Sequence, residues 1–261
     1  MAVGNSTIRS SLRILDLFCP QRLRWTVSEI AAEMSITYAT ANRYVNALKS
    51  SGLLEAERGS LVLAPRLLYL AELVHQSDHF AHAVRATVDE VADQTGETVI
   101  ANRLVDHSIV GVVRAESHRV VRFSFEPGQR MPLNAGAAAK AIMAFLPAST
   151  AARLLSKADW RPMTESTITN PVAFDAELAL VREQGWAEST GEVEQDIYAM
   201  AVPVFFPWRE VAGSLCLCGP TFRMDGAARQ RCLAALREGA AGINRHLADQ
   251  PRPRPQRGGQ A

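Results

Sequence analysis

The sequence lacks a long uninterrupted apolar run. Its longest apolar stretch, Ala135–Leu146, is interrupted by Gly136 and Lys140, whereas a transmembrane helix needs about 20 predominantly apolar residues. The segment Met1–Phe18 is charged and polar, so it has no apolar signal-peptide core. We therefore expect no association with a membrane and a cytoplasmic location.

Cysteine is scarce. The 261 residues include four cysteines, Cys19, Cys216, Cys218 and Cys232. This number is too small for a disulfide framework in a chain of this length, and we interpret all four as free thiols in a reducing compartment.

Motifs of the common catalytic sites are also missing. The sequence contains no Gly-x-Ser-x-Gly nucleophile elbow, no Gly-x-x-x-x-Gly-Lys phosphate loop and no His-Glu-x-x-His metalloprotease motif. Glu192 and Glu194 offer carboxylates that a cleft histidine would complement, but strand charges are usually solvated and nothing pairs a nucleophile with a base. We expect no enzymatic activity and no cofactor.

Neither sign of charge dominates. The chain has 28 Lys and Arg against 27 Asp and Glu, a net charge of +1, so it has no global basic signature for nucleic acid. Up to Arg66, however, eight basic residues stand against five acidic ones, a local excess compatible with a DNA-binding head.

At the other end, Pro251–Ala261 combines arginines with Pro and Gly and cannot bury enough surface to fold, which predicts a disordered tail.

Residues 1–66 are predicted to form a helical unit with a short hairpin. Ile8, Leu12, Leu15 and Phe18 recur at helical spacing, which predicts an amphipathic first helix that stops before Pro20. A second helix is expected to begin after a capping box, because a threonine at position 26 is followed three residues later by a glutamate. After a break at residues 35–36, a third helix is expected from position 37 to about position 51.

The third predicted helix has two different faces. Ala41, Val45 and Leu48 form an apolar face, and the opposite face carries long hydrogen-bonding side chains of the types that contact bases and phosphates. Gly52 is expected to end the helix, and two short strands around residues 58–60 predict a wing. The alternative is a three-helix bundle with a merely polar outer face, but the complete order of elements favours a winged helix-turn-helix. The candidate DNA-binding residues are Ser28, Thr37, Tyr38, Thr40, Asn42, Arg43, Asn46, Lys49, Arg58 and Ser60.

Residues 67–80 are predicted to form a linker and dimerisation helix. The segment has few charges, and a helix this apolar needs a partner, either the second domain or a second subunit. His75, His79 and His82 follow at i, i+4 and i+7, a spacing that would place three imidazoles on one helical face. Solvated or partner-facing histidines are the simpler interpretation, and whether they bind a metal stays open.

Residues 81–250 are predicted to be an α+β domain. Strands are expected at Thr98–Leu104, Ser108–Ala115, Val120–Phe125, Met200–Phe206 and Val211–Cys218. Helices are expected from residue 81 to Thr95, at Ala135–Leu146, Ser149–Lys157, Val172–Gln184 and Ala227–Leu247. Helices on an antiparallel sheet would form a sensor with a cleft on one face.

These motifs together resemble the IclR family of bacterial transcriptional regulators, over almost the whole chain. The family's turn and recognition helix correspond to Ser35–Arg43, and its loop-and-helix segment to Gly128, Pro132-Leu133, Ala135 and Lys140-Ala141. The most specific match lies at Gly185, Ser189, Glu192, Ala199-Met200-Ala201 and Val204-Phe205, with Gly219-Pro220 after the last strand. One position departs, because the signature usually ends in Asp or Asn and here ends in Phe206.

The resemblance implies a GAF-like effector-binding domain, a homodimer or homotetramer, and double-stranded operator DNA as the partner. It also implies a small organic acid as effector, and it leaves open whether operator binding activates or represses. The residues it places in the effector pocket are Ala137, Ala138, Ser189, Ala199, Cys216 and Cys218, with Ala137 and Ala138 offering backbone N–H groups to an anion.

The pocket positions differ from those of several family members. Those members have a carboxylate where this chain has Ser189, a cysteine at Ala199, and serines at Cys216 and Cys218. Each exchange removes charge or hydrogen-bonding capacity, so we expect an effector that is less polar, bulkier or more aromatic than a two- or three-carbon keto acid.

Two alternatives concern the same region. Cys216 and Cys218 lack an evident third and fourth ligand for a metal, and two cysteines on one strand face are poorly placed for a relaxed disulfide. We interpret them as small buried residues that line the pocket. The other alternative is a second domain that only oligomerises and binds no ligand, because few polar groups converge on the cleft.

Overall fold

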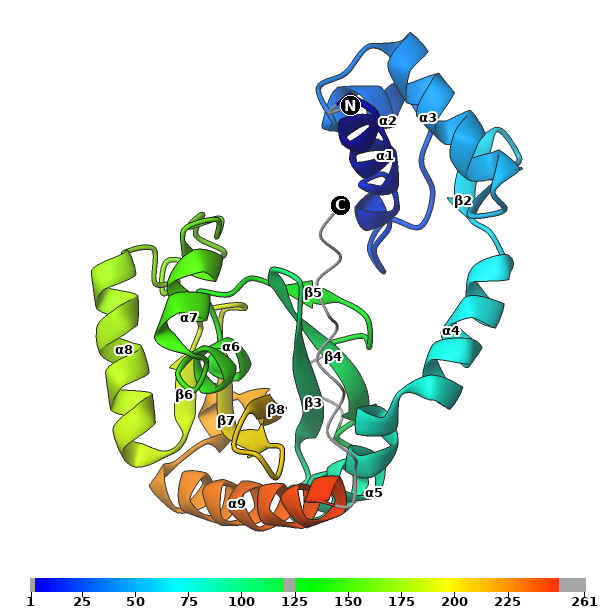
Figure 1. Ribbon diagram of the computed structural model, residues 1–261. Helices are drawn as coiled ribbons and strands as arrows, with labels where there is room; N and C mark the ends of the chain where they lie inside the picture. The colour runs from blue at the N-terminus through cyan, green and yellow to red at the C-terminus, as the bar shows by residue number, and fades with distance from the viewer. Residues whose placement is uncertain (1–2, 120–124, 249–261) are drawn as a thin grey trace. The chain divides into compact units, whose positions relative to one another are not determined.

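The chain divides into two compact units, Met1–Asp78 and His79–Ala261. The computed structural model describes residues 3–119 and 125–248 (Figure 1). The predicted tail, Pro251–Ala261, and the predicted strand Val120–Phe125 up to residue 124 lie outside the described residues. Within the described ranges, no helix is both long and apolar enough to cross a membrane.

The first unit begins with a helix that is shorter than predicted. Helix α1 covers Val3–Leu12 and is followed by the 3-10 helix η1, Leu15–Leu17. Ile8 and Leu12 are 61% and 45% exposed, whereas Ile14 is fully buried in the core of this unit. The expected single helix to Phe18 is therefore wrong. After Arg13, backbone N–H groups bond to the carbonyl three residues earlier instead of four. This tighter winding turns the later side chains onto a new face.

Helices α2, Val27–Glu33, and α3, Tyr38–Ser50, form the predicted pair. The capping box at the start of α2 is confirmed: the Glu29 N–H donates to Thr26 Oγ1 at 3.3 Å, and the Thr26 N–H donates to Glu29 Oε2 at 2.7 Å. The Thr26 N–H and the Thr26 hydroxyl, which donates to the same carboxylate oxygen at 2.8 Å, lower the pKa of Glu29. Thr37 caps α3 through a bond from the Thr40 N–H, as predicted.

A two-stranded hairpin follows α3. Strands β1, Leu54–Glu57, and β2, Ser60–Leu63, pair antiparallel, with Glu57 opposite Ser60. Arg58 and Gly59 connect them with φ angles of +51° and +83°, the left-handed backbone that a two-residue hairpin turn requires. The predicted wing is confirmed.

Helix α4, Arg66–Ser77, ends the first unit, and helix α5, His79–Thr95, begins the second. Asp78 between them has an extended backbone, so His75 lies on a different helix from His79 and His82. The predicted common helical face is thus interrupted, and no group of three or more His, Cys, Asp or Glu within the described ranges is placed to hold a metal ion.

The second unit contains a six-stranded antiparallel sheet with the strand order β5-β4-β3-β8-β7-β6. The strands are β3 Thr98–Val105, β4 Ser108–Ala115, β5 Arg130–Met131, β6 Ala187–Thr190, β7 Ile197–Phe205 and β8 Val211–Pro220. The helices are α6 Ala137–Met143, α7 Ala148–Leu155, α8 Pro171–Gln184 and α9 Gly226–Ala248, with the 3-10 helix η2 at Thr221–Arg223. The α+β architecture is confirmed.

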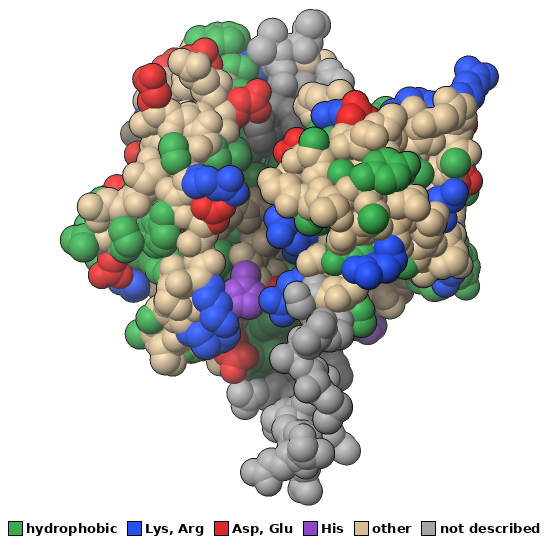
Figure 2. Space-filling model, turned by 90° about the horizontal axis from the view of Figure 1, so that it is seen from above, with side chains coloured by type: hydrophobic (Ala, Val, Ile, Leu, Met, Phe, Trp, Pro, Cys, Tyr) green, Lys and Arg blue, Asp and Glu red, His purple; other side chains and the backbone are tan. Residues whose placement is uncertain are grey.

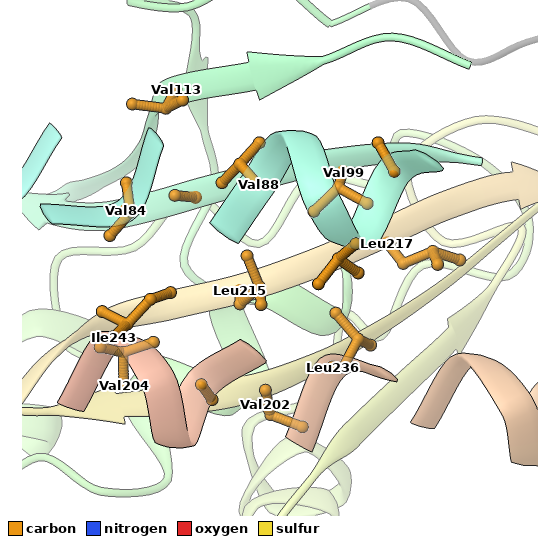
Figure 3. Close-up of a cluster of buried hydrophobic side chains, with 14 of the residues drawn as sticks. Val84, Val88, Val99, Val113, Val202, Val204, Leu215, Leu217, Leu236 and Ile243 are labelled. Carbon is orange, nitrogen blue, oxygen red and sulfur yellow. The ribbon is translucent and has the colours of Figure 1, made fainter. Parts of the chain in front are cut away.

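Each face of this sheet carries its own core. Helices α5 and α9 cover one face, and Figure 3 shows the valines, leucines and isoleucine that meet between them and the sheet. Helices α6, α7 and α8 pack on the other face (Figure 1). Strand β8 serves both cores because its side chains alternate: Leu215 and Leu217 belong to the first, and Cys216 and Cys218 to the second.

Candidate functional sites: an exposed helix and an enclosed cavity

The outer face of α3 is polar and accessible. Ala41, Tyr44, Val45 and Leu48 are buried in the core of the first unit, and Tyr38 on the opposite side is 58% exposed. All ten predicted DNA-binding residues are exposed or partly exposed. Those fully at the surface are Ser28, Thr37, Tyr38, Arg43, Asn46, Lys49 and Arg58, and those partly covered are Thr40, Asn42 and Ser60.

Two basic side chains of α3 are not neutralised by carboxylates. The Arg43 guanidinium lies 5.5 Å above the Tyr44 ring, and neither Arg43 nor Lys49 forms an ion pair with any residue in the described part of the chain. The nearby acidic residues Glu29 and Glu57 are instead paired with arginines outside α3. Arg43 and Lys49 are therefore available to phosphates or base edges.

No large area of one charge stands out on the face of the molecule in Figure 2, where Lys and Arg are interspersed with Asp, Glu and hydrophobic side chains. This agrees with the net charge of +1. An interaction with a polyanion would therefore depend on local groups such as the face of α3 rather than on the total charge.

The second unit encloses a cavity between its sheet and α6. The space within it that is open to a water-sized molecule is about 40 Å³, and the surrounding hollow, including solvent at its mouth, is about 480 Å³. All six residues that the family resemblance placed in a pocket line it. The lining consists of Ile100, Asn102, Phe125, Met131, Gly136, Ala137, Ala138, Ser189, Glu192, Val193, Glu194, Ile197, Ala199, Cys216 and Cys218.

Strand register explains why distant residues meet on the cavity floor. Ile100 of β3 is opposite Cys216 of β8, and Cys218 of β8 is opposite Ala199 of β7. Ala199 is in turn opposite Ser189 of β6. Directly opposite residues place their side chains on the same face of a sheet, so these five share the side that α6 covers.

The start of α6 is bonded to the neighbouring strands. The Gly136 N–H donates to Glu192 Oε2 at 2.9 Å, and the Ala137 N–H donates to Ser189 Oγ at 3.1 Å. We expected both Ala137 and Ala138 to offer an N–H to an anion, but the Ala137 donor is occupied by the serine hydroxyl. The Ala138 N–H has no acceptor among the residues that the structure describes.

A buried ion pair holds the cavity wall against α6. Lys140 Nζ lies 2.7 Å from Glu192 Oε1 and 3.1 Å from Glu177 Oε2, and the side chains of Lys140 and Glu192 are only 2% and 8% exposed. We expected the Glu192 carboxylate to be solvated, and this is wrong, because it is buried and neutralised by the Lys140 ammonium group. A lysine in the otherwise apolar segment Ala137–Met143 was the sequence signal for a buried partner, since lysine is almost never fully buried unpaired.

The two cysteines on the cavity floor are in contact. Cys216 Sγ lies 3.7 Å from Cys218 Sγ, and all four cysteines of the chain are free thiols. The hydrogen bond with Cys216 and burial together raise the pKa of Cys218 well above the ordinary thiol value. The Cys218 thiol is therefore protonated at neutral pH.

Phe206, which stands where the family signature usually has Asp or Asn, lies at the β7–β8 turn, outside the cavity lining. Its ring stacks on Trp208 with centroids 4.7 Å apart, and it packs at the edge of the core beneath α5 and α9. The exchange of Asp or Asn for Phe206 therefore changes the turn rather than the cavity.

Two family models match the chain, one in the first unit and one mainly in the second. The model of the bacterial transcriptional regulator IclR C-terminal domain matches residues 72–245, and that of the IclR helix-turn-helix domain matches residues 8–58. The chain is 26% identical to the Pca operon regulatory protein of Acinetobacter baylyi over 83% of its own length and 79% of that protein.

Solved structures share the fold. An IclR transcriptional regulator from Alicyclobacillus acidocaldarius is 27% identical with a TM-score of 0.77, over 93% of this chain and 98% of that one. An IclR homolog from Microbacterium hydrocarbonoxydans, solved in complex with 4-hydroxybenzoate, is 23% identical with a TM-score of 0.73, over 92% and 98% of the two chains. The chain belongs to the IclR family of transcriptional regulators, which bind DNA through their helix-turn-helix domain.

Proposed function

We propose that this chain is a ligand-responsive regulator that reads its operator through α3 and senses a small organic acid in the cavity of its second unit. The proposed DNA-binding role rests on the outer face of α3. Its side chains there project away from the buried Ala41 and Val45, and they are Asn42, Arg43, Asn46 and Lys49. Such side chains contact base edges and phosphates in a major groove. The wing residues Arg58 and Ser60 and the residues Ser28, Thr37, Tyr38 and Thr40 would flank that contact.

Two substitutions separate the roles along α3. We expect Arg43→Ala to reduce affinity for the operator and to relax sequence preference, and Lys49→Ala to weaken binding to all DNA and to lower the salt dependence. Fluorescence anisotropy with labelled upstream DNA at several salt concentrations measures both effects. Wild-type affinity in the Arg43→Ala variant would show that α3 is not the recognition helix.

We propose an aromatic or bulkier organic acid as effector, with the first polar contacts made by Ser189 and the backbone at Ala138. Support comes from the lining, where Ile100, Phe125, Met131 and Ile197 surround few polar groups. Glu192 is already neutralised by Lys140 and so does not require a cationic ligand. An aromatic acid also fits the 4-hydroxybenzoate held by the homolog from Microbacterium hydrocarbonoxydans.

Calorimetry with a panel of acids tests this effector class. We expect binding of a benzoate-type acid and no binding of glyoxylate or pyruvate. A variant with a filled cavity, Ala199→Phe, should lose binding while it retains operator affinity. Tight binding of the keto acids alone would refute the aromatic class, and no binding of any acid would favour a second unit that only oligomerises.

We propose that α4 joins two copies of the chain into a homodimer, with residues 1–66, 67–80 and 81–250 as DNA-binding domain, linker helix and effector-binding domain. Its large apolar side chains face solvent, with Leu68 76% and Val74 59% exposed. An exposed apolar helix of this kind suits a two-fold pair that reads two half-sites. Light scattering should give a dimer or tetramer for the wild type and a smaller species for Leu68→Lys/Val74→Lys.

A further inference from the structure

The two thiols on the cavity floor are held at a fixed spacing. Cys216 and Cys218 belong to β8, which is paired with β3 on one side and β7 on the other. The two residues are 3% and 6% exposed, both line the cavity, and their sulfur atoms are 3.7 Å apart. Because both residues lie on one strand that is hydrogen-bonded on both sides, the two sulfurs present a preformed pair to anything inside the cavity.

This spacing selects the geometry of a bridging atom. With bonds to sulfur of about 2.3 Å, as at zinc, a linear centre would need sulfurs about 4.6 Å apart, whereas a tetrahedral or pyramidal centre spans about 3.3–3.8 Å. A disulfide would require the sulfurs to approach to about 2.05 Å and would need an oxidant. The observed separation therefore suits a single bent centre bonded to both sulfurs.

The surroundings disfavour an ordinary metal ion at this place. Zinc takes four ligands, and no cluster of three or more His, Cys, Asp or Glu occurs in the described ranges. Metal ligation also requires thiolates, whereas the hydrogen bond with Cys216 and burial keep the pKa of Cys218 high. A suitable ligand must react with neutral thiols and bring its own third substituent.

We propose that Cys216 and Cys218 form a capture site for trivalent arsenicals, above all those with an aryl substituent. An arsenical oxide R–As=O reacts with two thiols to form two As–S bonds, and both thiol protons leave with the oxygen as one molecule of water. Arsenic stays trivalent, so no oxidant or reductant is consumed. The aryl group would occupy the apolar space beside Ile100, Phe125 and Met131.

The site is independent of whether the cavity also binds an organic acid. Capture requires only the two thiols and the space above them, and operator binding by the untreated protein reports separately on the proposed regulatory function. Failure of either proposal therefore leaves the other intact.

Phenylarsine oxide is the probe, applied to the native full-length chain at neutral pH. We expect intact mass spectrometry to show one bridging adduct per chain, with the loss of one water, that survives excess monothiol and is removed by ethanedithiol. Digestion with trypsin should locate it on the peptide of residues 210–223, which contains both cysteines. This mapping on the wild type tests the site even if a variant fails to fold.

Matched variants complete the test. Cys216→Ala and Cys218→Ala should each abolish the monothiol-resistant adduct, because one As–S bond is then lost. Cys232→Ala, which removes a cysteine that is 5% exposed and outside the cavity lining, and Cys19→Ala should retain it in full. An adduct that monothiol removes, one that maps to another peptide, or one that forms only in denaturant would overturn the proposal.

Discussion

Replacing Lys140 by Met should destabilise the second unit more than any surface substitution. Methionine keeps the length of the buried stem but removes the ammonium group that lies 2.7 Å from Glu192 Oε1. Among the described residues, the Glu192 carboxylate, 8% exposed, then retains only the N–H of Gly136. Removal of one partner of a buried pair costs about 3–5 kcal/mol because the other charge stays buried and uncompensated.

Two further variants separate this cause from simple repacking. Glu177→Gln removes a carboxylate that is 40% exposed, so its loss should cost about 0–1 kcal/mol. Lys140→Met/Glu192→Met removes both buried charges and should be milder than Lys140→Met alone, because replacing a buried pair by apolar side chains is often neutral.

Urea unfolding followed by circular dichroism gives the free energies of unfolding. The reasoning is refuted if Lys140→Met costs less than about 1 kcal/mol, which is the range of exposed ion pairs. It is refuted equally if the double variant is less stable than Lys140→Met, since the buried carboxylate would then not be the source of the loss.

Two further substitutions test local features of the fold. Thr26→Ala removes the cap of α2 and should lower the free energy of unfolding by about 1 kcal/mol. Because Thr26 lowers the pKa of Glu29, the stability from the box is present at neutral pH and is lost as the pH falls through that lowered pKa; equal acid sensitivity of wild type and variant in urea unfolding would contradict this. Gly213→Ala would drive a methyl group into the Asn102 carbonyl oxygen and should cost about 1–3 kcal/mol. In the control Gly242→Ala, the added carbon meets only the end of Arg245 at 3.9 Å, so this variant should be neutral or slightly stabilising. Equal thermal shifts in the two variants would count against the crowding at Gly213.

The features that the sequence predicted are mostly local. The capping box needs only Thr26 and Glu29, and the wing needs a short turn whose residues adopt positive φ. Helices α3, α5, α8 and α9 lie close to their expected ranges, and α3 and α8 carry side-chain caps at Thr37 and Asn170. These signals depend on neighbours in the chain, so a sequence displays them directly.

The features that it missed depend on contacts between distant segments. Strand β5 has two residues, too few for any alternation, and β6 entered only through the family resemblance. Ile14 rather than Leu12 enters the core because the chain tightens into a 3-10 turn. The apolar residues around Lys140 indicate a buried partner, but that partner lies 52 residues away, so the sequence near Lys140 does not identify it as Glu192.

Footprinting of the DNA that flanks the gene tests most directly whether α3 presents its polar face to a major groove. The wild-type chain should protect two half-sites in a near-palindrome, with centres separated by about 10 base pairs or a multiple of this spacing, and Asn42→Ala/Arg43→Ala should lose this protection while its unfolding curve is unchanged. A flanking region with no protected segment, or an undiminished footprint in the double variant, would contradict the account.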